Sequence, residues 1–410
     1  MIPFSPPRMD QKIVDAVIDT LYSGWITTGP KTKRFEQMLT AYGGHQSTLC
    51  VSSGSAGLEL MLRWFGVRPG DEVIVPACTY SATANVVVHC GARVVFVDSG
   101  SDFNVSVEAI RKAITKRTKV IMPVDIAGWP CDYDAINHLV REPAVRKLFR
   151  PATREQHTLG RILVLSDAAH SIGAVYKGKK TGSLTDISVY SFHAVKNLTT
   201  AEGGAVCMDL PPPFDHKLIY RDLNVKSLHG QTKDALAKTQ IGSWKYDIVE
   251  PAYKYNMTDI QAAMGMVELE RYDRDMLVRR RHIFDRYTAA LSKQTWAEIP
   301  VYETPDRTSS FHVFLLRIKG ISEEQRDRII QDIFQKEVSV NVHFVPLPLM
   351  TWYKKEGYRI RDYPVAYDNF SREITLPVYY DLTDEMVDTV LRVVVEAVAN
   401  VLNEHFAHLT

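Results

Sequence analysis

Between residues 48 and 165 the chain alternates short apolar runs with segments of helical periodicity. The apolar runs cover residues 49–51, 72–75, 93–97, 119–124 and 162–165, and the helical segments between them cover 56–65, 82–89, 107–114 and 133–140. Parallel strands need a long crossover, usually a helix, so this alternation predicts a mostly parallel sheet with helices on both faces. Ligands of such sheets bind at the carboxyl ends of the strands, where we therefore look for function.

The remaining segments suggest two domains. Helical spacing predicts helices at 8–22, around residues 35–39 and from about 259 to 287, where the arginines at 279–281 are expected on a solvated face. Beyond residue 300 the patterns favour strands at 311–318 and 338–342 and helices at 323–334 and 384–402. We expect a large α/β domain at 1–255 with a surface insertion at about 141–160, followed by a linking helix and a smaller α+β domain at 256–410.

Composition argues against several classes of function. The 410 residues carry 49 Lys+Arg against 48 Asp+Glu, so no overall basic field favours nucleic acid or an anionic membrane as a partner. The five cysteines show no CxxC spacing, which argues against a disulfide framework or a zinc site and favours free thiols in a reducing compartment. We expect a cytoplasmic globular protein that binds no metal.

One lysine stands in unusual surroundings. Lys196 follows the apolar run 187–192 and precedes hydroxyl residues and the pair Gly203–Gly204, which allows tight turns and close approach to a ligand. Burial beside a pocket lowers the pKa of an ammonium group, and the resulting amine can form a Schiff base. Most lysines are simply solvated, so the neighbouring motifs decide between the two interpretations.

Three further motifs follow predicted strands, and each has a purely structural alternative. Ser55 and Ala56 open a helix, which suits either a bound phosphate or a capped helix start. Asp167 ends a strand, where its carboxylate could either hold a proton on a heterocyclic nitrogen of a ligand or cap the next helix. Tyr80 could either stack on the flat ring of a ligand or be an aromatic residue of the core. Together with Lys196 these residues supply the amine, phosphate cradle, carboxylate and ring platform that pyridoxal phosphate requires.

At this point a resemblance to a known family becomes visible. The chain resembles the nucleotide-sugar aminotransferases, the DegT/StrS-type branch of the fold-type I pyridoxal-phosphate enzymes, over nearly its whole length. The similarity is carried by GDEVIVP at 70–76, DAAH at 167–170, SFHAVK at 191–196 and YKYNMTDIQAA at 253–263. It implies a seven-stranded type of sheet, pyridoxal 5′-phosphate as cofactor, and a homodimer in which the loop at 253–259 reaches into the neighbouring site.

The resemblance also assigns roles to single residues. Lys196 would hold the cofactor as a Schiff base, and Asp167 would pair with its pyridine nitrogen. His170 would lie beside the ring hydroxyl, and Tyr80 would stack on the ring. The residues expected at the phosphate are Ser55, Ala56 and Ser191, joined from the neighbouring subunit by Lys254 or Asn256, between which the sequence does not decide.

Substrate contacts follow from the same comparison. They are expected at Trp25, His193 and His343, although His343 equally fits the end of a buried strand. Asp125 and Trp129 stand where relatives often show His and a smaller polar residue, so they are expected to alter the substrate pocket.

The implied reaction moves an amino group from an amino acid, expected to be L-glutamate, to a keto sugar of a nucleotide sugar. The stretches around Trp25, Lys196 and Tyr253 are most similar to the branch that makes 4-amino sugars for bacterial surface polysaccharides, so C4 is the expected position. Two alternatives remain: a dehydratase-like reaction on the same cofactor, or a regulatory or sensing protein without enzymatic activity. Lys196 and Asp167 favour the aminotransferase.

Overall fold

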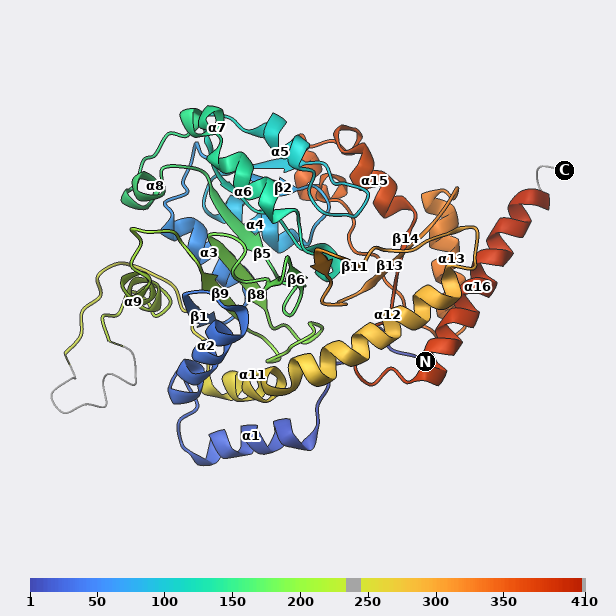
Figure 1. Ribbon diagram of the computed structural model, residues 1–410, viewed down its shortest axis with the longest axis horizontal. Helices are drawn as coiled ribbons and strands as arrows, with labels where there is room; N and C mark the ends of the chain where they lie inside the picture. The colour runs from blue at the N-terminus through green and yellow to red at the C-terminus, as the bar shows by residue number, and fades with distance from the viewer. Residues whose placement is uncertain (234–244, 408–410) are drawn as a thin grey trace.

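The computed structural model describes residues 1–233 and 245–407, the stretch 404–407 by its backbone alone. A seven-stranded sheet in the order β1-β9-β8-β5-β4-β2-β3 forms its centre (Figure 1). The strands are β1 (Ser47–Val51), β2 (Glu72–Pro76), β3 (Arg93–Val97), β4 (Thr118–Ile121), β5 (Leu163–Asp167), β8 (Ile187–Ser191) and β9 (Gly204–Met208). Only β9 pairs antiparallel with its neighbours, so the predicted mostly parallel sheet is confirmed.

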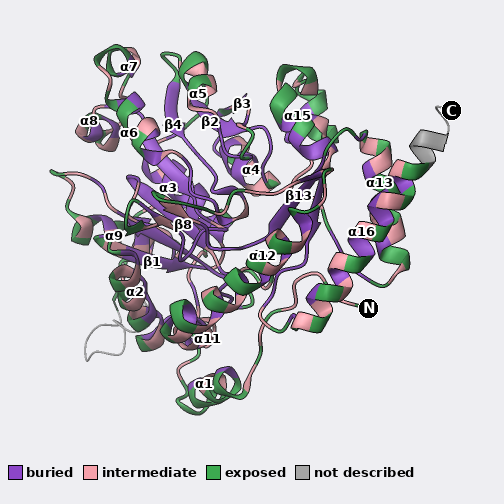
Figure 2. Ribbon diagram, turned by 45° about the vertical axis from the view of Figure 1, so that its right-hand side comes forward, coloured by how far each residue is buried: buried purple, intermediate pink, exposed green. Residues whose placement is uncertain are grey.

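Helices flank this sheet, and the sides that they turn toward it are buried, shown in purple in Figure 2. They are α2 (Pro30–Gly43), α3 (Gly54–Trp64), α4 (Ser81–His89), α5 (Val107–Ala113), α6 (Tyr133–Arg141) and α9 (His216–Lys226), while α1 (Gln11–Tyr22) packs outside them against the later helix α11 (Asp259–Arg271). The predicted helix-strand alternation is therefore confirmed, and α9 adds a helix within a stretch that the sequence showed only as polar.

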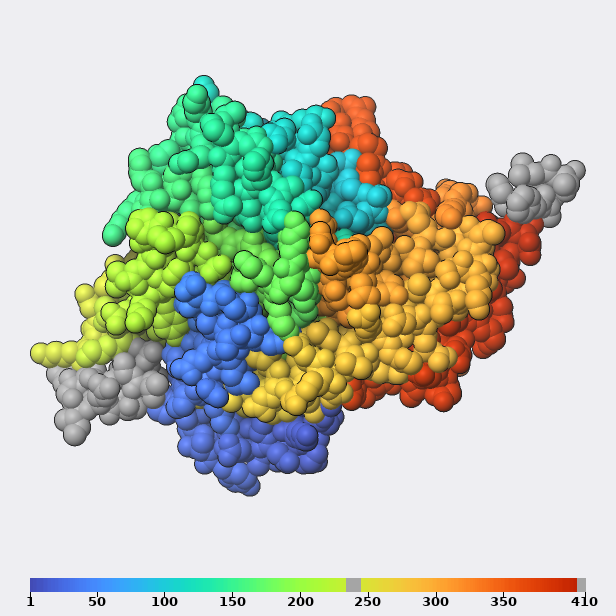
Figure 3. Space-filling view, in the orientation of Figure 1, coloured from blue at the N-terminus to red at the C-terminus, as the bar shows by residue number. Residues whose placement is uncertain are grey.

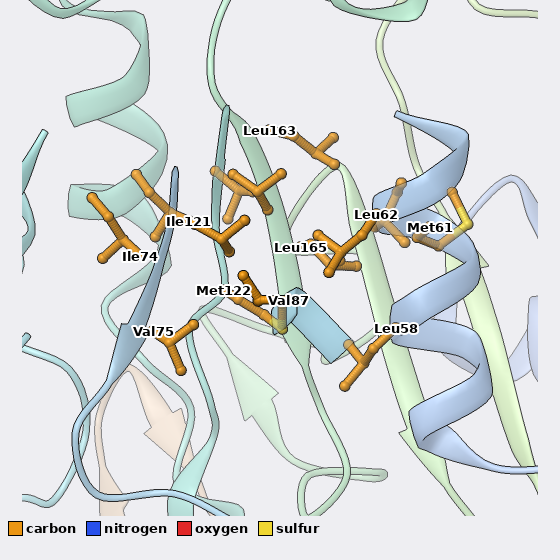
Figure 4. Packing of buried hydrophobic residues seen from close by; sticks show 14 of the residues in the cluster. Leu58, Met61, Leu62, Ile74, Val75, Val87, Ile121, Met122, Leu163 and Leu165 are labelled. Atoms are coloured by element: carbon orange, nitrogen blue, oxygen red, sulfur yellow. The ribbon is translucent and has the colours of Figure 1, made fainter. Parts of the chain in front are cut away.

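The packing of α3 shows why its sequence forms a buried helix. Leu58 and Leu62, at helical spacing, lie on the side of α3 that faces Leu165 of β5 (Figure 4), and Met61 is buried in the same cluster. All four side chains are buried, and full burial of such a side chain contributes about 1.5–3 kcal/mol. This packing holds the first turn of α3 at the carboxyl edge of the sheet.

A second unit follows the large sheet. Its three-stranded sheet has the order β10-β13-β14, formed by β10 (Ala297–Glu298), β13 (Phe314–Ile318) and β14 (Glu373–Leu376), with α13 (Glu323–Gln335) and α16 (Asp384–Ala407) packed around it. The segment with α14 (Thr351–Lys355) and α15 (Pro364–Ser371) returns to the large sheet, where the Leu347 amide donates to the Ala77 carbonyl at 2.8 Å. The predicted division at residue 255 therefore separates the seven-stranded sheet from the three-stranded one, but this returning segment packs on the large sheet, and a further small sheet joins residues 175–180 with residues 303–308.

The two units are joined by the predicted long helix, which consists of α11, a π-helical turn η2 (Tyr272–Met276) and α12 (Leu277–Leu291) (Figure 1). The expectation of a solvated arginine face is wrong for Arg280. That side chain is 3% exposed and donates to the carbonyls of Phe311 and His312 at 3.2 and 2.9 Å. Neighbouring arginines of the cluster at 279–281 therefore differ in exposure: Arg280 faces the small domain, whereas Arg281 faces solvent.

Two details differ from the sequence-based expectation. The predicted strand at 338–342 is wrong, because this stretch forms only isolated bridges. Val338 pairs with Ile2 and Asn341 pairs with Thr375, so no continuous ladder to one partner strand is formed. A four-stranded sheet of two-residue strands was not foreseen, since such strands carry no periodic signal; it contains β6 (Val175–Tyr176), β7 (Lys179–Lys180), β11 (Glu303–Thr304) and β12 (Arg307–Thr308).

The predicted insertion contains two short surface helices, α7 (Pro143–Leu148) and α8 (Arg154–Leu159), at the top of Figure 1. Its Gln156 side chain is buried and donates to the carbonyl of Phe65, just after the last turn of α3. The first turn of α3 lies roughly 15 Å away along the helix axis. The insertion thus supports the end of α3 opposite the carboxyl edge of the sheet.

No helix in the described parts of the chain is long and apolar enough to cross a membrane. All five cysteines are buried and carry free thiols.

A buried ion pair should contribute strongly to stability. Arg161 binds both carboxylate oxygens of Asp186 at 2.7 and 2.6 Å, and both residues are buried. We expect Arg161→Ala to lower the free energy of unfolding by about 3–5 kcal/mol, because it leaves a buried carboxylate unpaired. Urea unfolding measures this loss. Arg111 makes the same two-bond contact with Glu142 on the surface, so Arg111→Ala is the matched control and should shift the midpoint far less; equal shifts would contradict the prediction.

Candidate active site

A cavity of about 410 Å³ opens at the carboxyl edge of the large sheet. Strand ends, the first turn of α3 and the small-domain segment around His343 contribute to its wall. It brings together most of the residues singled out in the sequence, namely Ser55, Tyr80, Asp167, His170, Ser191, His193, Lys196 and His343. The position agrees with the rule for ligands of parallel sheets.

The first turn of α3 forms one end of the cavity. The Ser53 hydroxyl caps the helix by accepting from the Ala56 amide at 3.1 Å, while Ser55 is exposed toward the opening. A Cβ atom on Gly204 of β9 would lie 2.6 Å from the Gly54 nitrogen, so only a glycine lets β9 approach this turn. Close backbone and unpaired amides at a helix start suit a phosphate group.

Asp167 lies at the end of β5 and is buried. Its carboxylate accepts from the Thr83 hydroxyl at 2.8 Å and from the Ala169 amide at 3.2 Å. Burial raises the pKa of Asp167, while these two hydrogen bonds and the charge of Lys196 act in the opposite direction. The carboxylate is thus held in place with its charge poorly solvated, which favours pairing with a protonated ring nitrogen.

Lys196 lies on the turn after β8, and its amide donates to the His193 carbonyl at 2.9 Å. Burial lowers the pKa of the Lys196 amine to about 8, although the nearby charge of Asp167 raises it. The next residue, Asn197, donates to the Ser310 carbonyl at 2.8 Å and so ties the turn to the second unit. A substantial neutral fraction near pH 8 makes this amine a nucleophile.

Aromatic rings surround the space between Lys196 and α3. The His170 and Phe344 rings are stacked at 5.7 Å, and the exposed Tyr80 ring lies 6.0 Å from Phe344. His170 Nδ1 accepts from the Ala127 amide at 3.3 Å, so the proton of the neutral ring belongs on Nε2. Burial holds the pKa of His170 well below its usual range, so the ring stays neutral and Nε2 is its hydrogen-bond donor. Tyr80 is exposed, which excludes its interpretation as a core residue.

The structure adds residues that the sequence did not single out. Thr83 holds Asp167 from within α4, and its hydroxyl also contacts Thr79. His312 lies 4.4 Å from His170 between ring centroids, and Phe4 stacks on His343 at 5.6 Å. Phe4, Thr79 and His312 line the cavity, while Thr83 lies behind Asp167. The sequence contained no signal for Phe4 and His312, which come from distant parts of the chain, whereas Thr79 and Thr83 lie close to Tyr80 and could have been considered with it.

Four predicted residues do not line the cavity of their own chain. Ala56 is buried within the first turn of α3, where its amide is taken up by the Ser53 cap; the other three are Trp25, Lys254 and Asn256. The Trp25 indole donates to the Thr28 carbonyl at 3.1 Å, and the Asn256 amide donates to the Thr28 hydroxyl at 2.6 Å. Lys254 is exposed nearby in sequence. The loop before α2 and the 253–259 segment therefore form one surface, separate from the cavity wall.

Asp125 and Trp129 do not line the cavity either, so the expectation that they alter its wall is wrong. Both are buried. Asp125 accepts from the Tyr133 and Ser171 hydroxyls, each at 2.6 Å, and from the Cys131 amide at 2.9 Å. It acts as a structural anchor for the loop after β4.

The residues present fit pyridoxal 5′-phosphate: an amine with a lowered pKa, a buried carboxylate, a ring platform, and a helix start that β9 can approach because residue 204 is a glycine. Together, the fold and this site define a pyridoxal-phosphate-dependent transferase of fold-type I.

Comparison with known proteins gives the narrower assignment. The chain belongs to the DegT/DnrJ/EryC1/StrS aminotransferase family, whose model matches residues 7–395. It is 35% identical over 404 residues to the spore coat polysaccharide biosynthesis protein SpsC of Bacillus subtilis, with 96% of each chain covered. Family membership favours the enzyme over the regulatory alternative.

Solved structures agree. A putative sugar aminotransferase from Streptococcus pneumoniae, in its pyridoxamine-phosphate form, superposes with a TM-score of 0.94 at 46% identity, covering 98% of this chain and 100% of that one. The same protein is known in a pyridoxal-phosphate form. Helicobacter pylori PseC, an aminotransferase involved in the biosynthesis of pseudoaminic acid, shares the fold at 24% identity and a TM-score of 0.83, covering 97% and 99% of the two chains. The protein is thus a pyridoxal-phosphate-dependent sugar aminotransferase.

The pKa of Lys196 leads to a pH prediction. Recombination of cofactor-free protein with pyridoxal phosphate needs the neutral amine, so its rate should rise with pH through a midpoint near pH 8. Stopped-flow absorbance measures the rate. In Asp167→Asn the charge that raises the pKa of Lys196 is gone, so the midpoint should move to lower pH. A midpoint near that of free lysine, about 10.4, would refute the prediction.

Proposed function

We propose that the protein transfers the amino group of L-glutamate to C4 of a nucleotide-linked keto sugar, in amino-sugar biosynthesis for bacterial surface polysaccharides. The observation that carries the proposal is the Lys196 amine, with a pKa lowered to about 8, beside the buried Asp167. The similarity to SpsC, a spore coat polysaccharide biosynthesis protein, and to the putative sugar aminotransferase of Streptococcus pneumoniae supports the sugar class.

The cavity has the mixture of groups that a sugar needs. Phe4 offers an apolar ring, while Ser5, His193, Glu202 and His343 offer hydrogen-bonding groups on the same wall. Sugars present hydroxyl groups at their edges and C–H groups on their faces, so polar and aromatic side chains together suit them.

Bound pyridoxal phosphate supplies the electron sink for breaking bonds at the α-carbon of the donor. Within the proposal, Asp167 holds the proton of the pyridine nitrogen, and Thr83 orients Asp167. The Nζ atom of Lys196 would accept the proton from the α-carbon of the donor and return it at C4′ of the cofactor. Ser55 and Ser191 hold the phosphate at the start of α3.

We also propose a homodimer with shared active sites. Trp25 and Asn256 both donate to Thr28, and Lys254 lies two residues before Asn256. None of the three lines the cavity of its own chain, which suits a role in the site of a second copy. α1 projects from the body of the molecule, as the blue lower part of Figure 3 shows. Its neighbourhood exposes several large apolar side chains, a feature of protein interfaces: Val14, Ile18, Leu21, Tyr22 and Ile26.

The proposed location is the cytoplasm. The support is that all five cysteines carry buried free thiols, as is common in reducing compartments.

The proposed chemistry has a spectroscopic signature. The purified protein should be yellow, lose its visible absorbance when L-glutamate is added, and regain it with a 4-keto sugar nucleotide. Lys196→Ala should lower turnover by at least about 10²-fold, because it removes the group that moves the proton. Lys217→Ala, an exposed lysine on α9, is the control and should keep the activity.

Two outcomes would contradict this proposal. Full turnover by Lys196→Ala would exclude the role of the amine. Recovery of the absorbance with a 3-keto but not a 4-keto sugar nucleotide would contradict the position C4 while leaving the transamination intact.

Shared sites predict complementation between two inactive proteins. Lys196→Ala and the double variant Lys254→Ala/Asn256→Ala should each have low activity, yet mixed dimers should contain one site with all the necessary residues. We expect activity to reappear after subunit exchange, up to roughly a quarter of the wild-type value, since half of the dimers are mixed and one of their two sites is complete. Hybrid dimers detected by native mass spectrometry without activity would contradict shared sites.

A further inference from the structure

A buried hydrogen-bonded chain lies behind His343. The Nδ1 atom of His343 is 2.9 Å from the Thr375 hydroxyl, and that hydroxyl donates to Oε1 of Glu373 at 2.5 Å. Oε2 of Glu373 accepts from the backbone amide of His343 at 3.0 Å. Glu373 and Thr375 are both 0% exposed, whereas His343 lines the cavity. The chain therefore runs from a buried carboxyl group to the wall of the active site.

The number of protons determines the direction of this chain. A threonine hydroxyl has one proton, and when Glu373 is ionised this proton must point to the carboxylate. The Thr375 oxygen can then only accept, so Nδ1 of His343 must carry the ring proton. Nε2, on the opposite edge of the ring, is left as a hydrogen-bond acceptor.

Protonation of Glu373 reverses the chain. With a proton on Oε1, Glu373 donates to Thr375, and Thr375 donates its own proton to Nδ1 of His343. The neutral imidazole then carries its proton on Nε2, which becomes a hydrogen-bond donor. The same three heavy atoms remain in contact in both states.

The surroundings of Glu373 bring its ionisation into the working pH range. Burial raises the pKa of Glu373 to about 8, while the Thr375 hydroxyl, the His343 amide and the charges of Arg326 on α13 and Arg317 on β13 act in the opposite direction. Both protonation states are therefore populated between about pH 7 and 9. Burial, with a smaller effect from the Lys196 charge, lowers the pKa of His343 to about 3, so its ring stays neutral in this range.

We propose that Glu373, acting through Thr375, is a positioning residue that sets the tautomer of His343 and so decides whether Nε2 accepts or donates a hydrogen bond in the cavity. Phe4 stacks on the His343 ring at 5.6 Å with an interplanar angle of 18°, which keeps the ring orientation constant while the proton moves. If the proposed function holds, the ligand group facing Nε2 is a hydroxyl or carbonyl of the sugar.

The variant Glu373→Gln imitates one state. A glutamine amide can donate to Thr375 and accept from the His343 amide, as the protonated acid does, but it cannot ionise. It should fix His343 as the Nε2–H tautomer at every pH. Thr375→Val should uncouple the ring from residue 373. Glu324→Gln is the control, because Glu324 is an exposed glutamate on α13 of the same domain.

The direct test is ¹⁵N NMR of histidine-labelled, cofactor-free protein, in which the two ring nitrogens have different shifts in each tautomer. His343→Asn identifies the signals. In wild type and Glu324→Gln we expect the tautomer to change with a midpoint near pH 8, and in Glu373→Gln we expect the Nε2–H form throughout. The same pH-dependent change in Glu373→Gln, or no change in wild type, would overturn the proposal.

Kinetics test the consequence for the substrate. The acceptor KM of wild type should change on the order of fivefold between pH 7 and 9, the effect of one hydrogen bond, whereas that of Glu373→Gln should not follow this change. Equal pH dependence of KM in both proteins would exclude the contact between His343 and the acceptor. The glutamate-induced loss of absorbance should persist in Glu373→Gln, because residue 373 is not expected to take part in the reaction with the donor. If wild type itself showed no loss of absorbance with glutamate, the proposed function would be refuted instead.

Discussion

The site depends on two opposite charges, Lys196 and Asp167, held in a poorly hydrated space at one edge of a parallel sheet. Burial lowers the pKa of the lysine and raises that of the aspartate, while their mutual attraction opposes both effects. Because the environment disfavours the charged form of each group, the amine becomes nucleophilic near neutral pH. The carboxylate gains a strong preference for a cationic partner such as a protonated ring nitrogen.

The rest of the fold keeps this pair in position. β5 and β8 are parallel neighbours, so Asp167 and the turn carrying Lys196 emerge at the same edge. α3 is packed against this sheet along its whole length, and its first turn faces the same space. The second unit completes the wall through His312 and His343, and Asn197 binds the Lys196 turn to it through the Ser310 carbonyl. Rigid packing around the pair makes the arrangement available before any ligand enters.

Most of the sheet and the centre of the site could be predicted from the sequence because their signals are local. Asp167 and Lys196 each follow an apolar run, and a strand end is where such residues become accessible. The arginine at 280 was misjudged for the opposite reason: the residues around it are polar, and only the docking of α12 on the small domain buries it. The prediction of a strand at 338–342 was wrong because this stretch pairs with two different segments, at residues 2 and 375, and its own sequence does not show which partners it will meet.

The amino-acid sequence by itself determined the alternating strands and helices, and it predicted the amine, the carboxylate and the helix start of the candidate site, since each depends on residues close together in the chain. Only the tertiary structure decided which distant side chains support them. Thr83 reaches Asp167 across 84 positions, and Glu373 reaches the cavity through Thr375 and His343. It also separated Trp25 and Asn256 from the cavity of their own chain. The physical reason is that burial and hydrogen-bond partners arise from packing between elements, which local periodicity does not encode.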